Sequence, residues 1–202
     1  MKLSAAVISK IYGDDRTIYS AHEIKEILNF KRIPWKSQWG TGQFDDLVKT
    51  QTNDQVTLIT ETPRLTIVVK SAVITVQAYV SGQWLQLWEK EQIFHNGEVH
   101  VCNFAEIAKT YHRGETTEFA GQRCLREKLG ITRLYEISDC GVIETLAPRP
   151  SKKWLGMEAI YRQHHQTAIL SRRAFKKNGY IVKKKDRTIH FEWRKAIISG
   201  MC

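Results

Sequence analysis

The sequence predicts an α+β fold in which a mixed β-sheet is layered with helices. Residues 65–80 are rich in β-branched side chains and residues 84–94 alternate between apolar and polar, so both segments are typical of strands. Residues 117–129 suit a helix, and strand patterns return after it. Because strands and helices do not alternate regularly, the order favours an α+β layer fold over a parallel βαβ sheet.

Residues 1–63 are expected to form an N-terminal extension, and residues 64–202 the main domain. The extension contains a predicted helix at about Ser20 to Asn29, for which Ser20 is a suitable N-cap. Residues 31–54 resemble a loop, and we expect Trp35 and Trp39 to anchor it onto the core. Stacking of these two rings on a base is the alternative. The extension itself would serve as a lid, a dimer contact or an accessory half of a binding site.

The main domain begins with strands. Turns are predicted at Ser81-Gly82 and Asn96-Gly97, because these dipeptides separate strand patterns. Residues 103–111 indicate a short helix or a loop. After the central helix, strands are expected within residues 133–146, 167–175, 180–184 and 188–193.

The central helix has a start and a stop signal. Thr116 or Thr117 can accept the first backbone N–H bonds, and Gly130 supplies a left-handed end. Helical spacing gives the helix one apolar stripe, which consists of Ala120, Cys124, Leu125 and Leu129. One face of this helix is therefore expected to pack and another to present charge.

Composition excludes some classes of protein. With 42% hydrophobic residues the chain can bury a substantial core, and no apolar run reaches the ~20 residues of a membrane span. The first fifteen residues are too interrupted by charge for a signal peptide, so a cytoplasmic protein is expected. The four cysteines form no CxxC pair and no zinc-like spacing, which indicates reduced thiols. Cys124 is expected to be a packed apolar residue, with a reactive thiol as the alternative.

The net charge of +10 is concentrated near the C-terminus. Residues 151–195 contain thirteen basic and three acidic residues, whereas the remainder of the chain is balanced. Three of the basic residues, Lys183, Lys184 and Lys185, lie at a predicted hairpin turn. Such a concentration of positive charge attracts polyphosphate, nucleic acid or an acidic protein. A solvated, solubilising face is the alternative.

The segment Gly114–Ile131 resembles the Nudix box, the loop–helix–loop signature of the Nudix hydrolases, Gly-x5-Glu-x7-Arg-Glu-U-x-Glu-Glu-x-Gly-U with U aliphatic. Six positions match without a gap, namely Glu115, Arg123, Leu125, Glu127, Gly130 and Ile131. A weaker likeness to the closing strands of some Nudix-like proteins extends from Met157 to Trp193. The resemblance implies a Nudix-like fold, in which Arg123 organises the loop by pairing with Glu115.

Three positions of the box do not match. Lys109 stands in place of the opening Gly, Cys124 in place of the Glu after the Arg, and Lys128 in place of the second paired Glu. The resemblance implies that the last two positions hold the main Mg²⁺ or Mn²⁺ ligands in active members. A thiol is a poor ligand for a hard cation, and a protonated ammonium has no lone pair to offer. The box is therefore predicted to be degenerate.

Three functions remain compatible with the sequence. The first is a Nudix-like protein that binds a nucleotide, a nucleoside-diphosphate compound or nucleic acid without hydrolysing it by the usual metal route. In this interpretation the ligand would meet the cations Arg123, Lys128, Lys183, Lys184 and Lys185.

The second function is an active pyrophosphohydrolase with a rearranged Mg²⁺ or Mn²⁺ site. Glu115 and Glu127 would then be its catalytic residues and metal ligands, Glu118 lies nearby in the box, and Glu144 or Glu158 would complete the site. The third function is a non-enzymatic scaffold whose basic face binds RNA or an acidic protein. The sequence indicates no membrane partner and leaves the identity of the ligand and the oligomeric state open.

Overall fold

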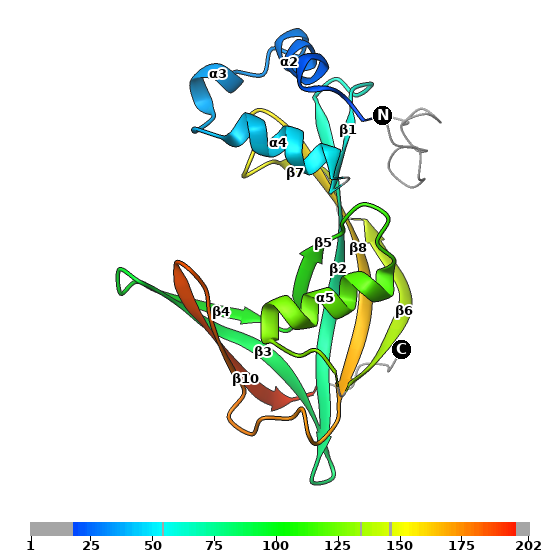
Figure 1. Cartoon of the computed structure of the whole chain (residues 1–202), viewed down its shortest axis with the longest axis vertical. Coiled ribbons are helices and arrows are strands. Elements are labelled where there is room, and N and C mark those ends of the chain that lie inside the picture. The colour runs from blue at the N-terminus through cyan, green and yellow to red at the C-terminus, as the bar shows by residue number, and fades with distance from the viewer. Residues whose placement is uncertain (1–17, 54, 134, 146, 197–202) are drawn as a thin grey trace. The chain divides into compact units, whose positions relative to one another are not determined.

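The structure is a computed structural model that describes residues 18–53, 55–133, 135–145 and 147–196, without the side chains of residues 142–145. The predicted absence of a signal peptide and Cys202 fall outside these residues. The helices are α2 (Ala21–Phe30), α3 (Trp35–Gln38), α4 (Gln43–Thr52) and α5 (Thr117–Leu129). The strands are β1 (Val56–Ile59), β2 (Thr66–Val80), β3 (Gln83–Phe94), β4 (Val99–Phe104), β5 (Ile107–Thr110), β6 (Tyr135–Thr145), β7 (Arg149–Pro150), β8 (Glu158–Leu170), β9 (Tyr180–Lys183) and β10 (Arg187–Lys195) (Figure 1).

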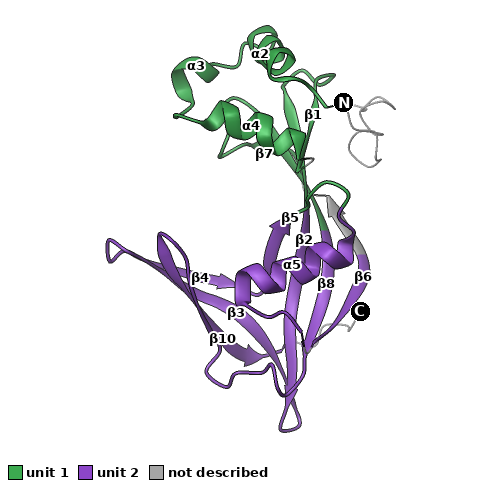
Figure 2. Ribbon diagram, viewed as in Figure 1, with its two compact units in different colours: residues 1–70, 110–114, 144–163 green, residues 71–109, 115–143, 164–202 purple. Residues whose placement is uncertain are grey.

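The predicted α+β class, with a mixed sheet and a few helices, is confirmed. The main strand order is β6-β8-β2-β3-β10-β9, with β1 and β5 paired to β2, β4 paired to β3, and β7 paired to β8. The chain divides into two compact units whose segments interleave (Figure 2). Unit 1 comprises residues 1–70, 110–114 and 144–163, and unit 2 comprises residues 71–109, 115–143 and 164–202. The predicted domain boundary between residues 63 and 64 stays a prediction.

Tight turns fix the sheet register of unit 2. Strands β2 and β3 pair antiparallel from Val80↔Gln83 onward, and both residues of the predicted turn, Ser81 and Gly82, have positive φ values of 50° and 80°. Positive φ at both central positions is the geometry that matches the twist of a two-residue hairpin. The turn at Asn96-Gly97 is also present, because the Gly97 N–H donates to the Phe94 carbonyl over 2.9 Å. Both predicted turns are confirmed.

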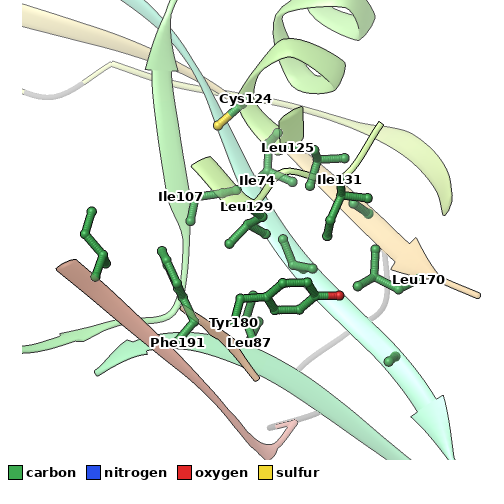
Figure 3. Close-up of a cluster of buried hydrophobic side chains, with 14 residues drawn as sticks. Ile74, Leu87, Ile107, Cys124, Leu125, Leu129, Ile131, Leu170, Tyr180 and Phe191 are labelled. Atoms are coloured by element: carbon green, nitrogen blue, oxygen red, sulfur yellow. The ribbon is translucent and has the colours of Figure 1, made fainter. Parts of the chain in front are cut away.

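The main core of unit 2 lies between α5 and one face of the sheet. Cys124, Leu125 and Leu129 of α5 pack with strand residues that include Ile74 and Phe191 (Figure 3). Ala120 is also fully buried, so the apolar stripe predicted from helical spacing is confirmed. Packing of this stripe fixes which side of α5 carries the charged residues.

Unit 1 has its own core and three of the helices. The helix predicted at Ser20 to Asn29 is present as α2, and Ser20 and Glu23 form a reciprocal capping box. Trp39 donates its ring N–H to the Leu155 carbonyl over 2.9 Å, and Trp35 donates to Asn29 Oδ1 over 3.1 Å. Both rings also pack against the core of unit 1, so the prediction that they anchor this segment is confirmed.

The strand expected within residues 167–175 is present only as far as Leu170, where β8 ends. Two further assignments made from the sequence were wrong. Residues 31–54 are not a loop, because they contain α3 and the ten-residue α4, whose Leu47 is fully buried. Residues 103–111 contain the end of β4 and the strand β5, whose hydrogen-bonded neighbour is β2. In both cases tertiary packing outweighs a weak local signal. Within the described residues, no helix is long and apolar enough to cross a membrane.

Candidate functional site

The candidate site lies on α5, which begins and ends as the sequence predicts. The Thr116 side chain accepts a hydrogen bond from the Phe119 N–H over 3.3 Å, and Gly130 has a φ of 72° at the C-cap. The Gly130 N–H donates to the Arg126 carbonyl over 2.9 Å, which closes the last turn. Hydrogen bonds therefore stabilise both ends of the helix, and the backbone from which its charged side chains extend is fixed.

Arg123 and Glu115 form a bidentate ion pair. Arg123 Nε donates to Glu115 Oε1 and a terminal guanidinium nitrogen donates to Glu115 Oε2, each over 2.8 Å. The two side chains are only 8% and 12% exposed. The hydrogen bond to Glu115 raises the pKa of Arg123 further, against the opposing effect of burial. The predicted pairing is present, and it links the loop before α5 to the middle of the helix.

Glu127 is paired with a cation that the sequence analysis did not assign. The ammonium of Lys109, on β5, lies 2.7 Å from Glu127 Oε2, and a guanidinium nitrogen of Arg123 lies 3.7 Å from the same oxygen. The hydrogen bond from Lys109 lowers the pKa of Glu127, although burial opposes the change. Glu127 is therefore an ionised carboxylate whose charge is already neutralised within the protein.

Cys124 is fully buried in the core of unit 2. Burial raises the pKa of its thiol to about 12, and this effect outweighs the opposite influence of Lys128, Lys109 and Arg123. The packed apolar residue predicted at this position is confirmed. The alternative of a reactive thiolate is contradicted, because desolvation keeps the proton on sulfur at neutral pH.

These donors do not fit a Mg²⁺ or Mn²⁺ ion. Both ions need carboxylate oxygens in an open coordination sphere, whereas Glu115 and Glu127 are already paired with Arg123 and Lys109. A buried neutral thiol and the ammonium of Lys128 stand at the other two box positions. In the part of the chain that the structure describes, no group of three or more His, Cys, Asp and Glu residues could hold a metal ion.

The other carboxylates considered for a rearranged metal site do not change the conclusion that these donors do not fit a Mg²⁺ or Mn²⁺ ion. Glu118 accepts a hydrogen bond from the Gln122 amide over 3.0 Å. Glu158 belongs to unit 1, where it forms an ion pair with Arg64 over 3.0 Å. The side chain of Glu144 lies outside the described residues.

The basic hairpin and the C-terminal end of α5 meet within unit 2. The ammonium of Lys184 donates a hydrogen bond to the Glu127 carbonyl over 2.6 Å, so it caps one of the last carbonyls of the helix. Helix α5 also contacts β9 directly. Lys183 and Lys185, on either side of Lys184, are exposed. The structure thus brings Lys128 and Lys184, which are distant in sequence, to the same end of one helix. Tyr180 and Val182 of β9 pack in the core and Ile181 is exposed, so Lys183 projects from the face of β9 that is turned away from α5.

Gly179 fixes the start of β9 in this arrangement. Its φ is 76°, and a Cβ added there would overlap the Phe191 carbonyl oxygen on β10. The predicted turn at Lys177-Asn178-Gly179 is present, since the Gly179 N–H donates to the Lys176 carbonyl over 2.8 Å. Only glycine allows this close backbone approach without a shift of β10.

The residue that sequence reasoning missed is Lys109. Its only signal was a charged residue at the box position where the resemblance expects Gly. Lys109 and Glu127 are connected through the pairing of β5 with β2 and the packing of α5 on the sheet, and neither can be read from local sequence. We define the box cluster as Lys109, Glu115, Arg123, Glu127, Lys128 and Lys184. Its four cations outnumber its two carboxylates.

The comparisons with known proteins are limited. No protein-family model matches the chain, and no curated protein matches it. Similar solved structures include the Ap4A hydrolase of C. elegans, with a TM-score of 0.37 and 16% identity over 63% of this chain and 80% of that chain. The Nudix hydrolase RenU of M. smegmatis has a TM-score of 0.33 and 14% identity over 61% and 68% of the two chains. The NUDIX domain of Shewanella oneidensis NrtR, solved with ADP ribose, has a TM-score of 0.33 and 14% identity over 62% and 71%. At these TM-scores, the similarity carries no information about the activity of this chain.

Proposed function

We propose that this protein binds a nucleotide or a nucleoside-diphosphate compound at the box cluster, and that it does so without a divalent metal and without metal-assisted hydrolysis. The ion pair between Lys109 and Glu127, 2.7 Å in length, is the observation that carries the proposal. A metal ion at Glu127 would have to displace an ammonium group that already neutralises the carboxylate. The degenerate box therefore presents internal cations where a hydrolase would present a metal.

The excess of positive charge supports an anionic ligand. Arg123 is committed to Glu115 and nearly buried, so its role is to hold the loop rather than to contact a ligand. Lys128 is partly exposed and Lys184 is exposed at the same end of α5, so these two ammonium groups of the box cluster are available to a diphosphate. Lys184 offsets the partial negative charge at the end of α5, which would otherwise repel an anion. Nucleic acid offers the same phosphate chemistry and is the alternative ligand.

The proposal is tested by calorimetric titration with ADP in EDTA and, separately, in Mg²⁺. We expect binding in EDTA that is not strengthened by Mg²⁺. Replacing Lys128 and Lys184 together with Gln should weaken ADP binding about tenfold, since each exposed charge contributes a fraction of a kcal/mol to about 1 kcal/mol. Lys177→Gln removes an exposed ammonium from the turn before β9 and serves as the matched control.

Turnover is the outcome that overturns the proposal. A panel of nucleoside-diphosphate-linked compounds is incubated with Mg²⁺ or Mn²⁺, and phosphate and nucleotide release are measured for the natural protein and for Glu127→Gln. Release that Glu127→Gln abolishes would establish the pyrophosphohydrolase with Glu127 as a surviving ligand. If ADP does not bind and only an acidic polypeptide does, the scaffold function replaces the proposal.

A further inference from the structure

A pair of aromatic rings with an ammonium group at each end lies on the helices of unit 1, away from the residues of the box cluster in sequence and in unit. The Lys25 ammonium is 5.2 Å from the centre of the Phe44 ring, the Phe44 ring is 5.0 Å from the Trp35 ring, and the Lys36 ammonium is 5.5 Å from the Trp35 ring. We call these four residues, together with Phe30, the aromatic row. Its members come from α2, α3 and α4; direct contacts join Lys25, Phe44, Trp35 and Lys36, and Phe30 ends α2 one residue after Asn29, which bonds to Trp35.

Phe30 is the most exposed large hydrophobic residue in this part of the chain. It ends α2, and 81% of its surface is accessible. It directly follows Asn29, whose side-chain oxygen accepts the ring N–H of Trp35 over 3.1 Å. A single exposed aromatic residue is common on protein surfaces. Phe30 differs because the residue before it is bonded to Trp35, whose ring packs on Phe44 and lies beside the Lys36 ammonium.

Two rings of the row, Trp35 and Phe44, are fixed in position before any ligand arrives. Trp35 and Phe44 are partly buried and pack against the core of unit 1, which also contains the fully buried Ile24 and Leu28 of α2. The capping box at Ser20 holds the start of the same helix. A surface that is already ordered loses little conformational entropy on binding.

The charge of the row is positive. From Lys25 to Lys36 the sequence contains four basic residues and one acidic residue. That acidic residue, Glu26, lies 3.3 Å from His22 on the preceding turn. Lys25, Arg32 and Lys36 are exposed. Ammonium groups therefore lie at both ends of the Trp35–Phe44 pair, as a polyanion requires. Of the two acids that follow Phe44 in α4, Asp46 is paired with Lys153 over 2.6 Å and Asp45 is exposed.

We propose that the aromatic row is a binding surface for single-stranded nucleic acid, in which bases stack on Phe30 and on the Trp35–Phe44 pair while Lys25 and Lys36 contact phosphates. Stacking on aromatic rings requires unpaired bases, which is why the row suits a single strand and not a duplex. Because Lys25 and Lys36 lie beside the rings, their ammonium groups can contact the phosphates of a strand whose bases stack on those rings. This surface is independent of the function proposed for the box cluster.

The test uses fluorescence anisotropy of the full-length protein with labelled oligo(rU) and oligo(dT) of about fifteen nucleotides, a length that covers one site. Phe30→Ala should raise the Kd about fivefold or more, because a stacked base is lost. Phe30→Trp should keep the natural affinity, because a ring remains. The Lys25→Gln and Lys36→Gln double variant should lower the slope of log K against log salt by about 1.4, since two phosphate contacts are removed.

Matched controls test whether the effects are specific to the aromatic row or arise from the loss of any exposed ring or ammonium group. Phe104→Ala removes a side chain that is 61% exposed on β4 of unit 2, and Lys49→Gln removes an exposed ammonium from α4 of unit 1. Both should leave the Kd within twofold of the natural value. Circular dichroism and a thermal melt establish that each variant is folded.

Two outcomes would overturn the inference, and the comparison of the two oligonucleotides would specify its ligand. An unchanged Kd in Phe30→Ala together with an unchanged salt slope in the lysine double variant would remove the row from nucleic-acid binding. Equal competition by polyglutamate would identify an acidic protein as the partner. Stronger binding of oligo(rU) than oligo(dT) would assign the site to RNA, and the reverse to DNA. ADP binding at the box cluster should be unchanged in Phe30→Ala, so failure of this inference is distinguishable from failure of the proposed function.

Discussion

Replacing Glu115 with Gln should destabilise unit 2 more than any exposed charge substitution does. The change keeps the size of the side chain and removes only the charge that faces Arg123. Both side chains are at least 88% buried, and two hydrogen bonds of 2.8 Å join them. After the substitution Arg123 remains charged, because its pKa is too high for the guanidinium to lose a proton.

The magnitude follows from the charge left behind. Removing one partner of a buried ion pair costs about 3–5 kcal/mol, because the other charge stays buried without compensation. Glu127 lies 3.7 Å from Arg123 and compensates in part, and the Gln amide oxygen still accepts one hydrogen bond. We therefore expect the lower end of the range, about 3 kcal/mol.

The assay is hydrogen exchange of the α5 amides at increasing urea concentration, which reports the opening free energy of unit 2 separately from unit 1. Asp186→Asn is the matched control, because Asp186 pairs with Arg187 over 2.9 Å in the same unit but its side chain is 60% exposed. Such a surface pair contributes about 0–1 kcal/mol.

A loss below about 1 kcal/mol in Glu115→Gln, equal to that of Asp186→Asn, would refute the reasoning, since the pair would then behave as if solvated. A second variant tests the mechanism. If the penalty comes from an uncompensated charge, adding Arg123→Met to Glu115→Gln should recover part of the lost stability, because no buried charge remains. If the penalty comes from lost packing, the double variant should be less stable than the single one.

Three further predictions concern α5 and its contacts. The folded-state pKa of Glu127 is lowered, so its ion pair stabilises the protein at pH values above the unfolded-state pKa. This stability is lost as the pH falls below about 5 and through the folded-state pKa. In urea titrations, the free energy of unfolding should therefore differ less between neutral and acidic pH in Glu127→Gln than in the natural protein. The buried Cys124 thiol, with a pKa of about 12, should be alkylated by iodoacetamide far more slowly than the partly exposed Cys140, as peptide mass spectrometry would show. Gly121→Ala should lower the melting temperature and cost about 1–3 kcal/mol, because the added Cβ would overlap the Gln166 side-chain oxygen.

The sequence was most informative where local chemistry alone decides the structure. The capped helix α5, the helix after Ser20 and the turn at Ser81-Gly82 depend on side chains that interact within a few residues. Helix α4 was missed because its segment is polar and follows Gly40 and Gly42, which favour a loop assignment. Strand β5 was missed because four residues are too few to show a period.

In the candidate site, the ion pair within the box could be predicted from the sequence, whereas the contacts between the box and the strands could not. The pairing of Arg123 with Glu115 spans eight residues and follows from the resemblance of the box. The contact of Lys109 with Glu127 joins β5 to α5, and Lys184 reaches the same helix across fifty-seven positions. No pattern in the sequence reports such contacts, because they depend on how β5 and β9 lie beside the helix.

The three mismatched positions of the box act together in the structure. Cys124 removes a carboxylate and buries a neutral group, Lys128 adds a positive charge one helical turn later, and Lys109 occupies the carboxylate that remains. Restoring Glu at 124 and 128 would therefore not by itself recreate a metal site, because the Lys109 ammonium already competes for Glu127. The cation required by the remaining carboxylate is supplied by the chain itself, and this supports the proposal that the box cluster binds an anion and not a metal ion.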